Sequence, residues 1–183
     1  MGSLAIHRGE WWRLITATTL HADIGHLASN LGSGLLLMGV AMARYGAGYA
    51  LLATLLAGVT GNLMGYLLRT QPYHGLGASG VVMGALGLLA IQSLGHLRRH
   101  PSSKRQILSG FVGGAFLFVL LGLNPAADVL AHTGGFLAGL ALGVLGNLLP
   151  ARITKALWFN WMGVVTSALL IGLAWILALV THG

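Results

Sequence analysis

The sequence contains no cysteine, and only three of its 183 residues are Asp or Glu. Without cysteine the chain has no disulfide, no thiolate ligand for zinc or an iron–sulfur cluster, and no cysteine nucleophile. A zinc peptidase of the His-Glu-x-x-His type is excluded as well, because the only glutamate, Glu10, follows a glycine. An aspartyl protease that works inside a membrane needs two carboxylates within spans, and no carboxylate here lies deep in an apolar stretch. Any catalysis must therefore use Ser, Thr, His or the three carboxylates.

Charge of either sign is scarce: 7% of the residues are charged and 56% are hydrophobic. Soluble domains are about 25% charged, so an ordinary soluble globule is excluded, and a disordered chain would need far more charge. The net charge is +7, but the basic residues are scattered and form no dense patch that could follow phosphates. We therefore expect no nucleic-acid partner. The composition predicts one polytopic membrane domain, residues 1–183, with lipid as its surroundings.

Six apolar stretches are long enough to cross a bilayer as helices. They cover residues 25–43, 47–68, 79–97, 107–123, 128–149 and 158–181. The predicted fold is therefore an all-α bundle of about six transmembrane helices joined by short loops. Residues 1–24 are expected to form a segment outside the membrane, 25–149 the core, and 158–181 an additional C-terminal helix.

The distribution of basic residues predicts an orientation. With the segment before the first span placed outside, the inner side receives Arg44, Arg98, Arg99, Lys104, Arg105, Arg152 and Lys155, and the outer side receives Arg8, Arg13 and Arg69. Cytoplasmic loops carry an excess of Lys and Arg, so both termini are expected on the outer side. All three carboxylates then lie on the outer side too.

Polar side chains gather at the outer ends of the first, third and fifth spans. His26 and Asn30 are four residues apart and share a helix face. Ser79 lies in the glycine-rich run 75–80, where missing side chains let backbone N–H groups approach a ligand at a helix N-terminus. His132 lies at the start of the fifth span. A serine, a histidine base and oxyanion donors at one membrane depth indicate a candidate catalytic site.

Each of these elements also has a simpler interpretation. Gly-Ala-Ser-Gly is typical of small-residue helix packing, and intramembrane His and Asn often hydrogen-bond between helices. The catalytic interpretation is favoured because three separate spans place complementary groups at one end, while the inner ends carry no comparable cluster. Asp128 precedes His132 by four residues and is interpreted as a helix cap rather than a third catalytic residue. A Ser-His dyad of Ser79 and His132 remains.

Glycines at helical spacing predict that the third and fifth spans touch. The fifth span carries Gly135, Gly139 and Gly143, and the third carries Gly80, Gly84 and Gly87. Such faces allow close approach of two helix backbones. This contact would bring Ser79 towards His132.

Several motifs, in order, resemble the rhomboid family of intramembrane serine proteases over about residues 9–147. They are Gly9-Glu10-Trp11-Trp12-Arg13, His21, His26-x-x-x-Asn30, Gly77-Ala78-Ser79-Gly80 and Ala131-His132-x-x-Gly135-x-x-x-Gly139. The resemblance implies Ser79 as nucleophile, His132 as general base and then acid, and His26, Asn30 and the Ser79 N–H as oxyanion donors. It gives His21 a structural role. It also implies hydrolysis of peptide bonds in or next to transmembrane segments of protein substrates, without metal or cofactor, in the plasma (inner) membrane of a bacterium.

Three positions depart from the family pattern. The family normally has a further span before the Trp-Arg loop, and its absence here suggests a truncated chain or a late start codon. Met83 stands four residues after the nucleophile, where a Tyr often supports the catalytic histidine, and Met42 stands where a Glu is often found. These departures keep an alternative open, an inactive rhomboid-like protein that binds transmembrane clients. A channel or transporter ranks last because the spans become apolar towards the inner side.

Overall fold

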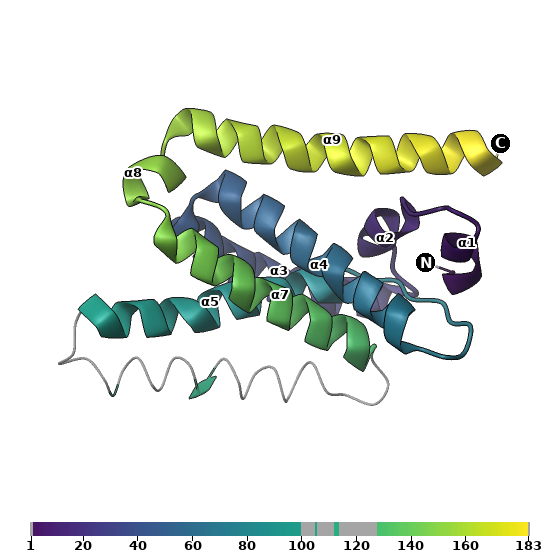
Figure 1. Cartoon of the computed structure of the whole chain (residues 1–183), viewed down its shortest axis with the longest axis horizontal. Helices are drawn as coiled ribbons and strands as arrows, with labels where there is room; N and C mark the ends of the chain where they lie inside the picture. The colour runs from purple at the N-terminus through teal and green to yellow at the C-terminus, as the bar shows by residue number, and fades with distance from the viewer. Residues whose placement is uncertain (1, 100–104, 106–111, 114–127, 183) are drawn as a thin grey trace.

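The computed structural model describes residues 2–99, 105, 112–113 and 128–182. Its long helices are α3 (Ile24–Tyr45), α4 (Ala47–Leu68), α5 (Ser79–Arg99), α7 (Val129–Leu148) and α9 (Leu157–His182) (Figure 1). Within these residues no strand occurs, only an isolated bridge between Gly2 and His74. The predicted all-α fold is confirmed.

The helices follow the predicted spans closely. Four of them, α3, α4, α7 and α9, are long and apolar enough to cross a membrane. The predicted span 79–97 lies within α5, whose first part, Ser79–Gln92, is a shorter apolar helix. The predicted span 107–123 lies outside the described residues, apart from residues 112–113. The chain is thus an integral, multi-pass membrane protein.

Helix α5 packs against α3, α4 and α7, and among the helices that the structure describes its contact with α7 is the most extensive. The two backbones touch along the predicted glycine faces. A side chain at Gly135 or Gly139 would overlap the carbonyl oxygen of Gly80 or Gly84, and one at Gly87 would overlap that of Phe136. Glycine is therefore required by the close approach of these two helices, as the spacing predicted.

Helix α9 runs along α4 and is attached near both of its ends (Figure 1). Near its start, Asn160 Oδ1 accepts a hydrogen bond from the Gly48 N–H at 2.8 Å, and its Nδ2 donates to the Thr154 carbonyl at 3.0 Å. Near its other end, Trp175 Nε1 donates to Thr19 Oγ1 at 3.2 Å. The end of α9 therefore lies beside the N-terminal segment, at the same end of the bundle.

The N-terminal segment is folded onto the bundle. It forms α1 (Ser3–His7), α2 (Arg13–Thr16) and a 3₁₀ turn, Ala17–Thr19. Its buried side chains pack on residues of α4 and on Tyr73; the cluster comprises Ile6, Leu14, Ala17, Val59, Leu63, Tyr66 and Tyr73. Asn62 of α4 donates to the Leu14 carbonyl at 2.8 Å. These contacts hold the segment over the end of the bundle where the candidate site lies.

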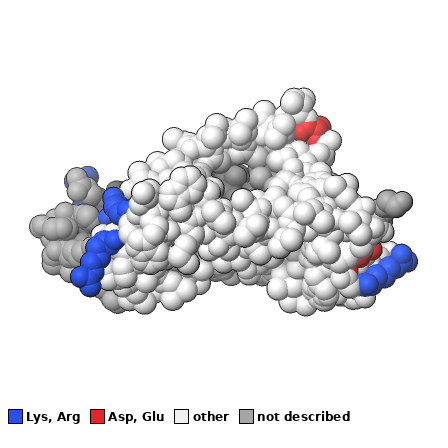
Figure 2. Space-filling model, turned by 90° about the horizontal axis from the view of Figure 1, so that it is seen from above, with Lys and Arg blue, Asp and Glu red and all other residues white. Residues whose placement is uncertain are grey.

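Charged side chains gather at the two ends of the molecule. Figure 2 shows Lys and Arg at one end, both signs at the other, and an uncharged middle between them. Large exposed apolar side chains cover the middle of the long helices, among them Leu35, Leu36, Leu137, Leu169 and Leu173. This arrangement is the one expected for a chain whose middle faces lipid.

Candidate active site

The four predicted site residues lie at the ends of three helices that meet at one end of the bundle. His26 and Asn30 occupy the first two turns of α3, Ser79 is the first residue of α5, and His132 lies in the first turn of α7. Both α3 and α7 pack against α5. Sequence-distant positions are thus collected around the N-terminus of α5.

His26 lies against the loop that leads into Ser79. Gly77 has φ +127°, and a Cβ there would lie 2.6 Å from His26 Cε1 and 2.7 Å from Nε2. The Gly77 N–H donates to the Ala17 carbonyl at 2.9 Å, which ties this loop to the N-terminal segment. Glycine is needed at position 77 for two reasons: other residues rarely adopt this positive φ, and a Cβ would clash with the His26 imidazole. The imidazole of His26 is therefore held directly against the backbone of the loop that leads into Ser79.

Asn30 is buried, with 8% of its surface exposed, and its Nδ2 has no hydrogen-bond partner. Among the described residues this is one of two such buried side-chain atoms; the other is Trp12 Nε1. Nδ2 lies 3.6 Å from the position that a Gly77 Cβ would take. An unpaired buried donor lowers the free energy of unfolding by about 1–3 kcal/mol. The Asn30 amide beside this loop therefore destabilises the fold as long as it has no partner.

His21 supports the same loop from the other side. The Ala78 N–H approaches His21 Nε2 at 3.5 Å, and the His21 ring lies 5.2 Å from that of His26, edge to face. Burial, and then the neighbouring His26, lower the pKa of His21, which favours the neutral form that accepts this hydrogen bond. The position fits the structural role expected for His21.

His132 is buried, with 5% of its surface exposed, and its turn is wedged between two other helices. A side chain at Gly61 of α4 would overlap the Ala131 carbonyl and lie 3.0 Å from Gly135 N. On the other side, Gly135 touches the backbone of Gly80, the residue after Ser79. The turns that carry His132 and Ser79 are thus packed backbone to backbone.

Asp128 begins α7 as its N-cap. Its Oδ1 accepts from the Ala131 N–H at 3.1 Å, and its carbonyl accepts the first helical hydrogen bond, from His132 N, at 2.9 Å. The predicted cap is confirmed. The sequence analysis did not single out the second partner of this carboxylate, Arg69, whose Nη2 donates to Oδ1 at 2.6 Å. A lone arginine just beyond an apolar span is the signal that could have indicated it.

Met83 lies one turn below Ser79 and is 3% exposed. It belongs to a buried cluster with Val82 and Leu86, against which Leu37 of α3 and Phe136 of α7 pack. Phe136 in turn lies one turn after His132. Met83 therefore fills the space beneath the site and joins the three helices that carry it.

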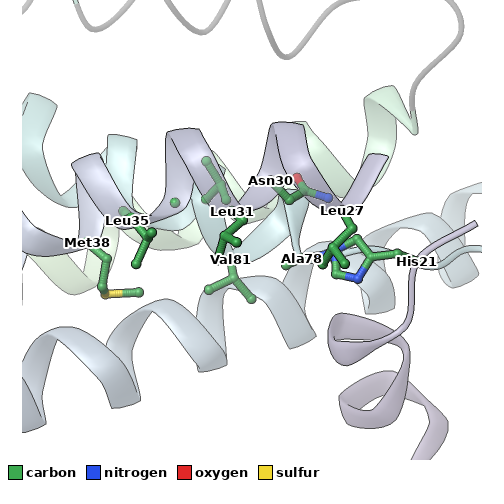
Figure 3. Close-up of a pocket in the computed structure, with 11 residues that line it drawn as sticks. His21, Leu27, Asn30, Leu31, Leu35, Met38, Ala78 and Val81 are labelled. Carbon is green, nitrogen blue, oxygen red and sulfur yellow. The ribbon is translucent and has the colours of Figure 1, made fainter. Parts of the chain in front are cut away.

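A groove of about 240 Å³ runs between α3 and α5 and opens onto the site. Figure 3 shows His21, Asn30 and Ala78 at one end of it and Leu35 and Met38 at the other. Between them the walls are apolar and include Leu31 and Val81. The groove is lined mainly by apolar side chains, with its polar groups gathered at one end.

The site offers no set of metal ligands. In the part of the chain that the structure covers, no three His, Cys, Asp or Glu side chains lie close enough together to hold an ion. What the arrangement can supply is a hydroxyl, an imidazole and N–H donors around one loop.

The chain is similar to known proteins over most of its length. Residues 8–148 match the Rhomboid domain. The chain is 35% identical to Rhomboid protease GluP of Bacillus subtilis over 76% of its own length and 27% of that protein's, and 29% identical to Putative rhomboid protease YdcA of the same organism over 78% and 71%. It is 32% identical to RHOMBOID-like protein 6, mitochondrial, of Arabidopsis thaliana over 79% and 47%. It thus spans about a quarter to a half of two of these relatives. No solved structure matches significantly.

Proposed function

Because the chain belongs to the rhomboid family, we propose that it is an intramembrane serine protease that hydrolyses peptide bonds in or next to transmembrane segments of membrane proteins. Ser79 is the nucleophile and His132 its base. His26, Asn30 and the Ser79 N–H bind the oxyanion. The observation that carries this assignment is the unpaired, buried Nδ2 of Asn30 beside the loop that leads into Ser79.

The reaction follows from these roles. Ser79 Oγ attacks the scissile carbonyl carbon while His132 takes the hydroxyl proton. The carbonyl oxygen becomes an oxyanion and receives hydrogen bonds from the donors on α3 and from the N-terminus of α5. When the intermediate collapses, His132 gives its proton to the leaving amine, and an acyl-enzyme remains. Water, deprotonated by His132, then attacks the acyl carbon; the ester bond to Ser79 breaks, His132 returns the proton to Ser79 Oγ, and the acid product leaves.

The groove between α3 and α5 suits an apolar substrate segment. Its length is lined by side chains such as Leu31, Leu35 and Val81, and its polar end lies at Asn30 and Ala78. A transmembrane segment that leaves its helix there would keep apolar side chains in the groove and present its backbone carbonyl to the polar end. Since lipid is as apolar as the groove, these side chains gain packing contacts there rather than transfer free energy from water.

The proposal includes the membrane in which the chain lies and its orientation there. We place the chain in the plasma (inner) membrane of a bacterium, with the site and both termini of the chain on the outer side. The Trp175–Thr19 contact supports a common side for the N-terminal segment and the end of α9. Arg44 lies in the last turn of α3, and Arg152 and Lys155 come just before the start of α9. These positions lie at the end of the bundle away from the site, where the excess of basic residues suits the cytoplasmic side.

Covalent labelling of the purified full chain in detergent with a fluorophosphonate tests the proposal. Wild type should be labelled at Ser79, and Ser79→Ala and His132→Ala should not be. Ser29→Ala, which removes an exposed serine on α3, is the matched control and should be labelled like wild type.

Labelling that persists in Ser79→Ala or His132→Ala would remove the dyad. A folded wild type that takes no label would instead favour the second candidate, an inactive rhomboid-like protein that binds transmembrane clients. Met83, in place of an aromatic support below the site, is the observation that keeps this candidate in view.

A further inference from the structure

An ion pair joins the end of α4 to the start of α7. Arg69 follows the last residue of α4, and its Nη2 lies 2.6 Å from Oδ1 of Asp128, the N-cap of α7. The two side chains are 33% and 22% exposed, so solvent screens the pair only partly. Each charge also complements the helix end beside it, the cation at a C-terminus and the anion at an N-terminus.

The arginine is held in place by an aromatic ring. The Arg69 guanidinium lies 4.3 Å from the centroid of the Tyr73 ring. Burial and, to a smaller extent, the nearby Asp128, opposed by Arg69, raise the pKa of Tyr73 to about 12, so the phenol is neutral at physiological pH. A cation over the face of a neutral aromatic ring is stabilised and loses much of its rotational freedom. Arg69 thus offers Asp128 a fixed partner.

Asp128 determines where α7 begins. Through its side chain it accepts from Ala131 N, and through its carbonyl it accepts from His132 N. A shift of the helix start by one residue would turn the side chains by about 100° and move them about 1.5 Å along the axis. Either change would alter where the imidazole of His132 lies relative to Ser79.

At the level of His132, the contacts of α7 with α4 and α5 are mainly between backbones. On both sides of the His132 turn, α7 meets glycines, Gly61 on α4 and Gly80 on α5. Glycine faces fix the distance between helices but offer no side chain that interlocks along the axis. The polar contact at the helix start therefore adds an axial constraint at the level of His132 to those that Phe136 and Leu142 provide further along α7.

We propose that Arg69 is a positioning residue: by holding the Asp128 cap it helps to set the axial position and rotation of α7 and so aligns His132 with Ser79. The inference rests on the proposed function, because the alignment of His132 with Ser79 affects activity only if these residues form the catalytic dyad. It assigns Arg69 no contact with substrate and no proton transfer.

The test uses a fluorophosphonate at several concentrations, so that the rate of the covalent step is separated from reversible binding of the probe. Arg69→Gln should lower the covalent rate constant about 10- to 10²-fold, because misplacement by about 1 Å has effects of that size. Binding of the probe should be unchanged. Arg69→Lys keeps the charge but loses the planar group that lies over Tyr73, so it should restore the rate only in part. Arg8→Gln, at an exposed arginine of the N-terminal segment, is the control and should match wild type.

Asp128→Asn keeps a capping oxygen but loses the charge, so it should resemble Arg69→Gln. The double variant should be no worse than either single one, because both remove the same contact. Thermal unfolding in detergent checks that each variant is folded. If Arg69→Gln is unfolded, the covalent rate constants of wild type, Arg69→Lys and Asp128→Asn are compared instead.

The outcomes separate the two proposals. An Arg69→Gln protein that labels as fast as wild type overturns the positioning role and leaves the protease assignment intact. A fall in Asp128→Asn alone also overturns it, and would indicate that the carboxylate acts directly on His132. A wild type without label overturns the proposed function and this inference together.

Discussion

Gly135→Ala is the sharpest probe of how α7 meets α5. The added methyl would overlap the Gly80 carbonyl oxygen and lie 3.1 Å from the Gly80 Cα and carbonyl carbon. All three atoms are backbone, so no rotamer change relieves the clash. Carbon atoms in favourable contact lie about 3.5–4.0 Å apart, so the helices must separate by about 1 Å at this level.

That separation has two expected costs. Overpacking of this kind destabilises a fold by about 1–3 kcal/mol. It also moves His132 away from Ser79 by a similar distance, and a displacement of about 1 Å at a reacting pair lowers the rate about 10²-fold. We therefore expect a lower midpoint of thermal unfolding and fluorophosphonate labelling about 10²-fold slower than in wild type.

Gly39→Ala on α3 is the matched control, because a Cβ there meets nothing within 4 Å. An alanine in an exposed helix position is more stable than glycine by about 0.5–1 kcal/mol, so this variant should unfold at the same temperature or slightly higher. A Gly135→Ala protein that unfolds and labels like Gly39→Ala would refute the close backbone contact between α5 and α7.

Two further predictions concern the α3 side of the site. Asn30→Ala should lower the labelling rate about 10²-fold without loss of folding, since one oxyanion donor among several is removed; misfolding would show instead that Asn30 is structural. His21 has its pKa lowered below the usual value of 6.5, so folding loses stability as the pH falls below about 6.5, where the unfolded chain binds more protons. The midpoint of thermal unfolding should therefore drop less between pH 7.5 and 5.5 in His21→Gln than in wild type, and His74→Gln, at an exposed histidine, should not reproduce this.

The helices and their main contact could be predicted because apolar length and glycine spacing are local properties of a sequence. The expected span 47–68 coincides with α4, and the others within the described residues differ from their helices by a few residues at most. The glycine series of Gly135 and Gly80 predicted the α5–α7 contact for the same reason. Such a contact depends on small residues that recur at helical spacing, which can be read from the sequence.

The remaining features depend on pairs of residues far apart in the chain. Nothing in the sequence near Gly77 shows that His26 lies against it, because this contact exists only once α3 and α5 are packed. The same holds for Arg69 with Asp128 and for the groove lined by Leu31 and Val81. The roles of Ser79 and His132 stay predictions that the labelling experiments test.

The turn that carries His132 fits between Gly61 of α4 and Gly80 of α5, and this has a consequence for biosynthesis. Synthesis proceeds from the N-terminus, so α3, α4 and α5 are made before α7. Ser79 therefore enters the membrane before His132, the base of the proposed dyad. Until α7 is inserted and docked, the nascent chain carries only an ordinary, unreactive hydroxyl. If Ser79 and His132 act as the proposed dyad, a chain whose synthesis stops before α7 lacks its base and does not cleave the membrane proteins around it.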